Sequence, residues 1–103
     1  MSEAWTRVAQ VSDVPEDGTL LVSLGDDPVC LYNIGGRILA THDTCTHGQA
    51  SLADGFIENG EIECPLHQGR FNIETGKAVS VPCTEDIRTY TVKIENGVVL
   101  LKG

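Results

Sequence analysis

The sequence predicts an all-β domain, and three observations lead to that prediction. Short β-prone segments recur at intervals of roughly ten residues. Turn signals built from Gly, Asn, Asp and Pro separate these segments. No long window shows the apolar spacing of a helix. Because 103 residues fit one domain and leave no room for a second core, we expect residues 1–103 to form a single domain.

The N-terminal half reads as a meander of short strands. Asp26-Asp27-Pro28 predicts a turn, and Gly35-Gly36 predicts a tight hairpin. Alternation places Leu20, Val22 and Leu24 on one face of their strand. Trp5 is expected to anchor the core. The strands predicted in this half are residues 5–9, 19–24, 29–34 and 37–41.

The C-terminal half continues the pattern with two clear hairpin signals. Asn59-Gly60 and Asn96-Gly97 favour the positive φ angles of a two-residue turn. Tyr90, Val92 and Ile94 alternate with polar residues, which predicts a half-buried strand. The strands predicted in this half are residues 56–58, 61–63, 70–73, 89–95 and 98–102.

The stretch with the most chemical information runs from Cys45 to His67. It holds Cys45-Thr46-His47, then sixteen residues, then Cys64-Pro65-Leu66-His67. Each pair stands among turn-forming residues that follow a predicted strand, so two short loops would each present one thiolate and one imidazole. Loops fixed at both ends by sheet can hold one metal centre between them.

Two kinds of metal centre suit two cysteines and two histidines, namely zinc and iron–sulfur. A zinc site of this composition usually has both cysteines in one turn and both histidines on one helix. Here each loop carries one of each, and no helix is predicted. The arrangement favours a two-iron cluster, with both sulfurs on one iron and both imidazoles on the other.

The composition limits the kinds of partner and the cellular compartment that we expect. Fifteen acidic and seven basic residues give a net charge of −8, which argues against nucleic acid and anionic membranes. No Lys or Arg lies between Ile38 and Gly69, where Asp43, Asp54 and three glutamates lie. This acidity is either an ordinary solvated surface or a means of steering a basic partner. No apolar run can span a membrane and no secretory signal is evident, so we expect a cytoplasmic protein.

Three further side chains could be mistaken for ligands. Cys30 and Cys83 are interpreted as reduced, partly buried thiols without an assigned role. His42 lies three residues before Cys45, but the four-ligand set is complete without it, so we interpret it as a surface or loop histidine. No nucleophile–base pair or nucleotide-binding motif is present. These observations favour a carrier over an enzyme.

The two motifs, Cys45-Thr46-His47 and Cys64-Pro65-Leu66-His67, resemble the two boxes of a Rieske [2Fe–2S] protein. The resemblance extends to Trp5, Asp13-Val14-Pro15 and the Thr75-Gly76 turn with Pro82 after it. In particular, the chain is similar to the small Rieske-type ferredoxins of bacterial aromatic-ring-hydroxylating dioxygenases. The resemblance implies stacked antiparallel sheets with a cluster-binding region at about residues 42–70.

The resemblance also implies a ligand set, a role and partners. Cys45 and Cys64 would bind one iron of a single [2Fe–2S] cluster, His47 and His67 would bind the other, and the segment around Val81-Pro82 would cover it. The chain would carry single electrons from a flavin-dependent ferredoxin reductase to a terminal Rieske non-haem iron oxygenase in aromatic hydrocarbon catabolism. It would act as a monomer with transient contacts.

Departures from the respiratory branch of the family predict a low reduction potential. Ala50 and Leu66 stand where that branch has a bridging disulfide, and Gly69 and Phe71 stand where it has hydroxyl donors to the cluster sulfurs. With fewer donors, the potential should lie near the bottom of the Rieske range of about −150 to +300 mV. The alternatives are a small Rieske subunit of a nitrite-reductase-like enzyme and a zinc-stabilised binding module.

Overall fold

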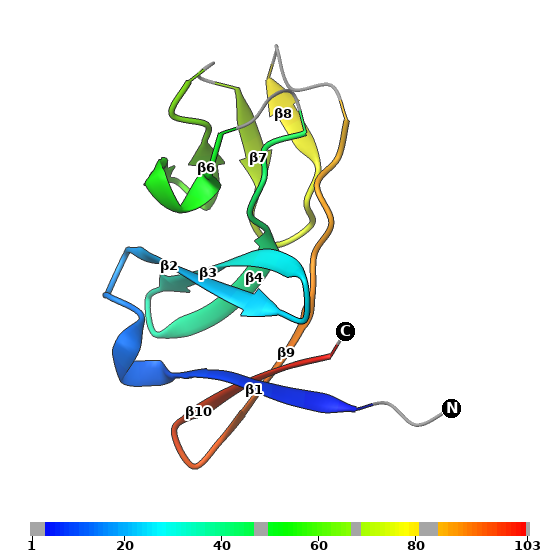
Figure 1. Ribbon diagram of the computed structural model, residues 1–103. Helices are drawn as coiled ribbons and strands as arrows, with labels where there is room; N and C mark the ends of the chain where they lie inside the picture. Colours follow the sequence, from blue (N-terminus) through cyan, green and yellow to red (C-terminus); the bar gives the residue numbers. More distant parts are fainter. Residues whose placement is uncertain (1–3, 47–49, 67–68, 81–84, 103) are drawn as a thin grey trace.

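The computed structural model describes residues 4–46, 50–66, 69–80 and 85–102. These residues form strands in three antiparallel sheets and two single-turn 3-10 helices, which confirms the predicted all-β class (Figure 1). The strands are β1 (Trp5–Gln10), β2 (Thr19–Leu24), β3 (Asp27–Ile34), β4 (Arg37–His42), β5 (Phe56–Glu58), β6 (Glu61–Glu63), β7 (Arg70–Asn72), β8 (Ala78–Ser80), β9 (Thr91–Glu95) and β10 (Val98–Lys102). The 3-10 helices are η1 (Val11–Asp13) and η2 (Leu52–Asp54).

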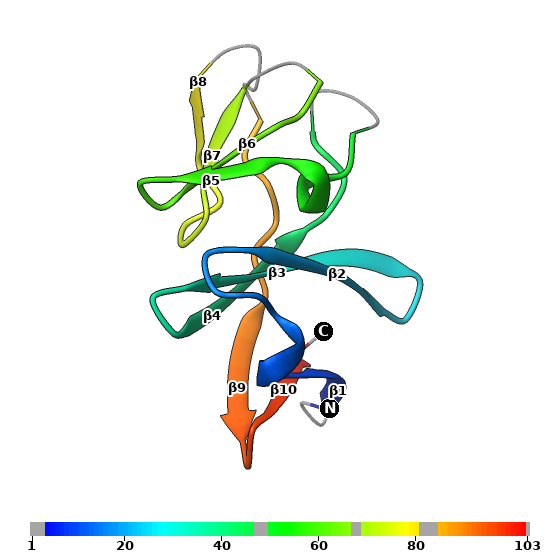
Figure 2. The ribbon, with the colours of Figure 1, turned by 90° about the vertical axis from the view of Figure 1, so that its left-hand side faces the viewer.

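The three sheets follow one another along the molecule. The terminal sheet has the order β1-β10-β9, the middle sheet β2-β3-β4, and the four-stranded sheet β5-β6-β7-β8. In Figures 1 and 2 the four-stranded sheet lies at one end, the terminal sheet lies at the other, and both chain ends lie near the terminal sheet. Residues 88–90 run alongside β4, where the amide N–H of Tyr90 donates to the Ala40 carbonyl at 3.0 Å. This contact joins the terminal and middle sheets.

The chain length was expected to leave no room for a second core, but strand β3 divides the interior into two because its side chains alternate in direction. Val29 and Leu31 face the base core, whereas Cys30 and Tyr32 face the ligand-loop core. All four side chains are fully buried. The buried members of the base core are Val14, Val29, Leu31, Ile38, Ala40, Tyr90, Val99 and Leu101. The buried members of the ligand-loop core are Cys30, Tyr32, Cys45, Ala50, Leu52, Ile62, Cys64, Phe71, Ile73 and Ile87.

The turn signals in the sequence are confirmed by the backbone. Asn59 and Gly60 have φ angles of 54° and 77°, and Asn96 and Gly97 have 51° and 77°. These left-handed conformations are the ones that a two-residue hairpin requires, and Asn and Gly adopt them at the lowest cost. They set the register Glu58↔Glu61 between β5 and β6 and Glu95↔Val98 between β9 and β10.

Some boundaries differ from the sequence-based expectation. Strand β3 begins at Asp27, so Asp27 and Pro28 lie in the strand and not in the turn that precedes it. Strand β8 was not predicted, and it pairs with β7 through an irregular register. The strand expected at residues 89–95 is shortened to Thr91–Glu95 because residues 88–90 pair with β4 instead.

Two apolar side chains are less buried than the sequence suggested. Trp5 belongs to neither core, and the Nζ atoms of Lys93 and Lys102 lie 5.3 and 5.6 Å from its ring centroid. The prediction of Trp5 as a core anchor was therefore wrong, because β1 directs its ring to the outer face of the terminal sheet. Ile94 is 46% exposed near the β9–β10 turn, so the half-buried pattern holds only for Tyr90 and Val92. No described segment is a helix long and apolar enough to cross a bilayer.

Candidate cluster site

The site is assembled from two loops that follow strands at the same end of the molecule. The first ligand loop, residues 45–50, follows β4, and the second ligand loop, residues 64–69, connects β6 to β7. Each loop is closed by a backbone hydrogen bond of the same type. The amide N–H of Cys45 donates to the carbonyl of Ala50 at 2.9 Å, and that of Cys64 donates to the carbonyl of Gly69 at 2.8 Å. Each predicted cysteine ligand thus stands at the base of a closed turn.

The two cysteines share one apolar environment. Cys45 is 3% exposed and Cys64 is fully buried, and both belong to the ligand-loop core. Phe71 and Leu52, each fully buried, are the largest apolar side chains of that core besides Tyr32. Two thiol side chains held under closed turns in a dry core suit a centre bound through sulfur, because thiolate ligands and exclusion of water stabilise such centres.

The histidines expected as ligands, His47 and His67, lie outside the described residues. So does the Val81-Pro82 segment that was expected to cover the cluster. The structure therefore brings Cys45 and Cys64 to one core, while the positions of the two imidazoles remain a prediction. Leu66, between Cys64 and His67 in the sequence, is 65% exposed, so the second ligand loop turns an apolar side chain outward.

A buried carboxylate supports the first ligand loop, and the sequence did not reveal it. Asp43 is only 4% exposed. Its Oδ2 atom accepts a hydrogen bond from the Ser51 hydroxyl at 2.6 Å, and its Oδ1 atom accepts one from the amide of Ala53 at 2.9 Å. Asp43 was counted among the acidic surface residues, and that interpretation was wrong. No local signal marks Asp43 as buried, because its two donors, the Ser51 hydroxyl and the Ala53 amide, lie eight and ten residues further along the chain.

Strand pairing and a tertiary contact support the remaining loop ends. Glu63 and Arg70, which flank the second ligand loop, are paired residues of β6 and β7. On the first ligand loop, the Thr46 hydroxyl donates to the carbonyl of Glu85 at 2.8 Å. This bond links the loop to the chain just beyond the segment 81–84. Both loops are therefore held by the rest of the fold as well as by their own turns.

The acidic side chains of the hairpin converge on one arginine. Arg70 lies 2.9 Å from Glu58, 3.6 Å from Glu61 and 3.0 Å from Glu63. The hydrogen bond that Arg70 donates to Glu58 raises the pKa of the Arg70 guanidinium, and the charges of Glu58 and Glu63 add to this effect. Three carboxylates around one guanidinium leave this face with excess negative charge. The acidic stretch is thus partly neutralised by the residue that immediately follows the second ligand loop.

Cys30 lies in the same core as the two predicted ligands but has a different character. Burial raises the pKa of its thiol to about 12, so it stays protonated at neutral pH. A neutral thiol is a poor metal ligand and a poor nucleophile. The expectation of a reduced, buried thiol is confirmed for Cys30, which forms no disulfide; Cys83 lies outside the described residues.

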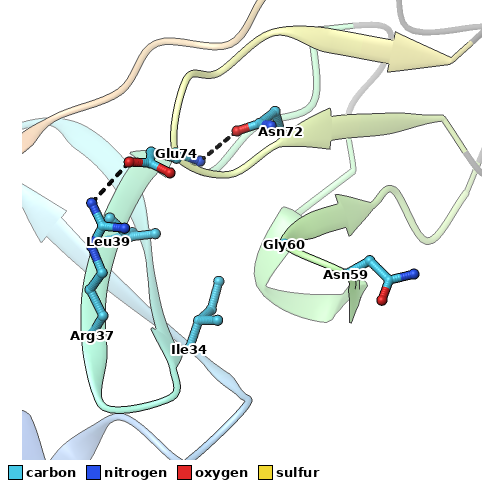
Figure 3. Close-up of a pocket in the computed structure, with 7 residues that line it drawn as sticks. All are labelled: Ile34, Arg37, Leu39, Asn59, Gly60, Asn72 and Glu74. Atoms are coloured by element: carbon cyan, nitrogen blue, oxygen red, sulfur yellow. Dashed lines mark hydrogen bonds and ion pairs between the residues drawn. The ribbon is translucent and has the colours of Figure 1, made fainter.

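His42 lies just before the first ligand loop, whereas a surface pocket lies apart from both loops. His42 is the last residue of β4, and its Nδ1 atom accepts a hydrogen bond from the amide of Thr44 at 3.3 Å. A pocket of about 300 Å³ lies where the middle sheet meets the four-stranded sheet (Figure 3). Arg37 and Glu74, which form an ion pair at 3.0 Å, both line this pocket. Neither Cys45 nor Cys64 lines it. The pocket is thus separate from the ligand loops.

Comparison with known proteins identifies the family. The Rieske [2Fe–2S] domain matches residues 4–91. The chain belongs to the Rieske [2Fe–2S] family. It follows that one Rieske-type [2Fe–2S] cluster is its cofactor, and the zinc alternative is set aside. When bound, such a cluster takes up and releases one electron at a time.

Two curated relatives match the Rieske chain along nearly its whole length. It is 50% identical over 102 residues to the ferredoxin component of the naphthalene 1,2-dioxygenase/salicylate 5-hydroxylase systems of Ralstonia sp., covering 99% of this chain and 98% of that protein. It is 53% identical over 105 residues to the ferredoxin component of the 2,4-dinitrotoluene dioxygenase system of Burkholderia sp. strain RASC, with coverage of 99% and 98%. The chain is thus a Rieske ferredoxin, an electron carrier and not a catalytic enzyme.

A solved structure confirms the fold. The chain is 38% identical, with a TM-score of 0.90, to a chain in the complex of reduced oxygenase and oxidized ferredoxin in carbazole 1,9a-dioxygenase. The match covers 99% of this chain and 95% of that chain. The stacked antiparallel sheets expected from the resemblance are therefore those of known Rieske ferredoxins.

Proposed function

We propose that this Rieske ferredoxin carries single electrons from a flavin-dependent ferredoxin reductase to the terminal Rieske non-haem iron oxygenase of an aromatic-ring dioxygenase system. The proposal is supported by relatives at 50% and 53% identity that are ferredoxin components of such systems. It is also supported by the likeness to a ferredoxin that forms a complex with its oxygenase. The observation that carries it is the pair of matched loops, which places Cys45 and Cys64 in one buried core.

The proposed ligand set is Cys45, Cys64, His47 and His67. Cys45 and Cys64, buried beneath the loops, would bind the inner iron, and His47 and His67 would bind the outer iron. Two features of the described residues favour this division. The cysteines stand at the inner ends of their loops, closed by N–H donation to Ala50 and Gly69. Leu66 is exposed, which indicates that the second ligand loop reaches the surface between its cysteine and its histidine.

The residues around the loops define what the protein contributes to electron transfer. The ligand-loop core excludes water from the cysteines, and the closed turns keep them in place, so that little rearrangement accompanies a change of charge. The negative charge that remains around Arg70 favours an encounter with a positively charged partner surface. We place the protein in the cytoplasm as a single-domain monomer whose contacts with its partners are transient.

Reconstituted electron transfer tests this function directly. The purified ferredoxin is mixed with a flavin-dependent reductase and NADH, and reduction of the cluster is followed by its visible absorbance. A terminal aromatic-ring oxygenase and its substrate are then added, and product is measured. Turnover that depends on catalytic amounts of the ferredoxin is expected. Isolation of the chain as a stable subunit of a nitrite-reductase-like enzyme, with no oxygenase turnover, would refute the shuttle.

A further inference from the structure

Every polar group of Asp43 takes part in a hydrogen bond, and three of the four bonds connect the two ends of the first ligand loop. Its amide donates to the carbonyl of Pro28 at 2.9 Å, which attaches it to β3. Its carbonyl accepts from the amide of Leu52 at 2.7 Å, and its two carboxylate oxygens accept from Ser51 and Ala53. Three of these four bonds therefore reach the segment that leaves the loop, from a residue two positions before Cys45.

The bonds around Asp43 fix the opening of the first ligand loop in register. Between the Asp43–Leu52 bond and the Cys45–Ala50 bond, Thr44 and Ser51 form an isolated β-bridge. The chain therefore runs as a short two-stranded ladder up to the point where Cys45 begins the turn. The carboxylate adds two side-chain bonds to this ladder and joins it to η2 through Ala53, whose carbonyl in turn accepts from the Thr19 hydroxyl at 2.7 Å.

The negative charge of Asp43 has no cationic partner among the described residues. No Lys or Arg there lies within ion-pair distance of its carboxylate, and its side-chain partners, a hydroxyl and an amide, are neutral. The charge nevertheless acts within the core. Burial is the main reason why the pKa of the Cys30 thiol is raised, and the charge of Asp43 raises that pKa further. A buried, unneutralised charge acts at longer range than an exposed one.

From this geometry we propose that Asp43 is a positioning residue that also sets the reduction potential. Its hydrogen bonds hold the ladder from which Cys45 and the first ligand loop extend. Its charge opposes the negative charge that an added electron brings to the cluster, and so lowers the midpoint potential. This inference rests on the cluster cofactor of the family and goes beyond the electron shuttle proposed above. It involves no chemical step besides the one-electron reduction by the reductase.

Three substitutions separate the hydrogen bonds from the charge. Asp43→Asn has nearly the same shape and can still accept from Ala53 and pair with Ser51, but it is neutral. Asp43→Ala removes the bonds as well as the charge. Asp54→Asn, at the exposed last residue of η2, is the matched control, because it also removes one carboxylate charge, from the segment that leaves the loop. The holoproteins are compared by the midpoint potential from voltammetry, the paramagnetic spectrum of the reduced state, and the rate of bleaching in a chelator.

The expected results differ for each variant. Asp43→Asn raises the midpoint potential well above that of Asp54→Asn and keeps the wild-type paramagnetic spectrum. Asp43→Ala bleaches several-fold faster than Asp43→Asn and has an altered spectrum. Equal midpoint potentials for Asp43→Asn and Asp54→Asn would overturn the electrostatic part, and equal bleaching of Asp43→Ala and wild type would overturn the positioning part. Failure of the wild-type protein to bind a cluster would instead refute the proposed function.

Discussion

The two ligand loops perform the same task with different structural support. Both are closed by an N–H from the cysteine to a carbonyl five residues later, at 2.9 and 2.8 Å. The second ligand loop joins the paired strands β6 and β7, so the sheet itself holds its ends. The first ligand loop begins where β4 has ended, and its ends are held by the buried Asp43 and by Ser51. Where regular pairing ends, a side chain supplies the missing bonds.

This difference indicates which loop depends on single residues. A sheet distributes its support over many backbone hydrogen bonds, so no one side chain is essential to it. The first ligand loop has only a short ladder at its ends, made by the Asp43–Leu52 bond and the Thr44–Ser51 bridge, and one carboxylate with two donors reinforces that ladder. We therefore expect the first ligand loop to be more sensitive to polar substitutions and the second ligand loop to packing defects beneath its strands.

The largest expected effect is common to both loops. Cys45→Ser and Cys64→Ser should each abolish cluster binding, because a neutral hydroxyl is a far weaker ligand for iron than a thiolate. Iron, acid-labile sulfide and visible absorbance measure the loss. Cys30→Ala is the matched control, since its neutral thiol lies in the same core, and this variant should keep the cluster. A coloured Cys45→Ser or Cys64→Ser protein would show that the loop was assigned the wrong ligand.

A packing defect beneath the end of β6 should weaken the support of the second ligand loop. A Cβ atom at Gly55 would lie 2.1 Å from the carbonyl oxygen of Glu63, next to Cys64. Gly55→Ala should therefore lower the free energy of unfolding by about 3 kcal/mol and speed cluster loss. Gly60→Ala in the same hairpin has positive φ but open space, and should cost about 1–2 kcal/mol. Urea denaturation of both variants measures the two losses of unfolding free energy. Equal losses would contradict the close contact between Gly55 and Glu63.

A buried thiol in the core beneath both loops should make the protein less stable as the pH rises into the alkaline range. The thiol of Cys30 has a pKa of about 12 when folded, against 9.0 as the ordinary value. The contribution of the protonated Cys30 thiol to the stability of the fold is complete below pH 9. It is lost as the pH rises further, because the unfolded chain then gives up a proton that the folded chain keeps. The free energy of unfolding should fall by up to about 1.4 kcal/mol per pH unit above that point. Denaturation at several pH values should show a shallower decline in Cys30→Ala.

A change of hydrogen bonding near the second ligand loop should move the reduction potential. Gly69→Ser with Phe71→Tyr would supply the hydroxyl donors that the respiratory branch has, and donors to cluster sulfur stabilise the reduced state. The midpoint potential should rise. Voltammetry of the folded double variant measures it, with Gly69→Ala and Phe71→Leu as controls that change the packing without adding a hydroxyl, since Phe71 is fully buried. An unchanged potential in a folded protein would contradict the low-potential interpretation.

The smallest expected effect concerns the charge beside the second ligand loop. Arg70→Gln removes the cation that pairs with Glu58, Glu61 and Glu63, so the midpoint potential should fall slightly. Arg37→Gln, which breaks an exposed pair with Glu74 in the pocket of Figure 3, is the matched control. The fall should diminish at high salt, because exposed charges are screened. A fall of the same size in Arg37→Gln would mean that the closeness of Arg70 to the second ligand loop does not affect the midpoint potential.

The sequence predicted the parts of the fold that depend on local signals. The hairpins at Asn59-Gly60 and Asn96-Gly97 were correct because a two-residue turn with positive φ requires such residues. Strand β8 was not predicted, because three residues in an irregular register carry no readable pattern. Residues 89 and 90 were expected to begin the strand that ends at residue 95, but residues 88–90 pair with β4, a partner almost fifty positions away that no local pattern reveals.

The residues of the candidate site also divide into those marked by a local motif and those that depend on contacts between distant parts of the chain. The paired Cys-His motifs predicted Cys45 and Cys64 as ligands, and the fold brings both to one core, while their role as ligands stays a prediction. Asp43 was misread because an Asp in an acidic stretch looks like surface charge until the fold brings Ser51 and Ala53 to it. Arg70 was overlooked as the counterion of the hairpin because its partners lie across strands and not along the chain.

The alternation of β3 between two cores restricts where the chain can change length. Val29 and Leu31 face one core while Cys30 and Tyr32 face the other. Insertion of a single residue within β3 would exchange these two sets and place a thiol and a phenol where aliphatic side chains belong. We expect insertions to be accepted at the turns on either side, at Gly25 or Gly35, where added atoms meet open space, and rejected anywhere between them.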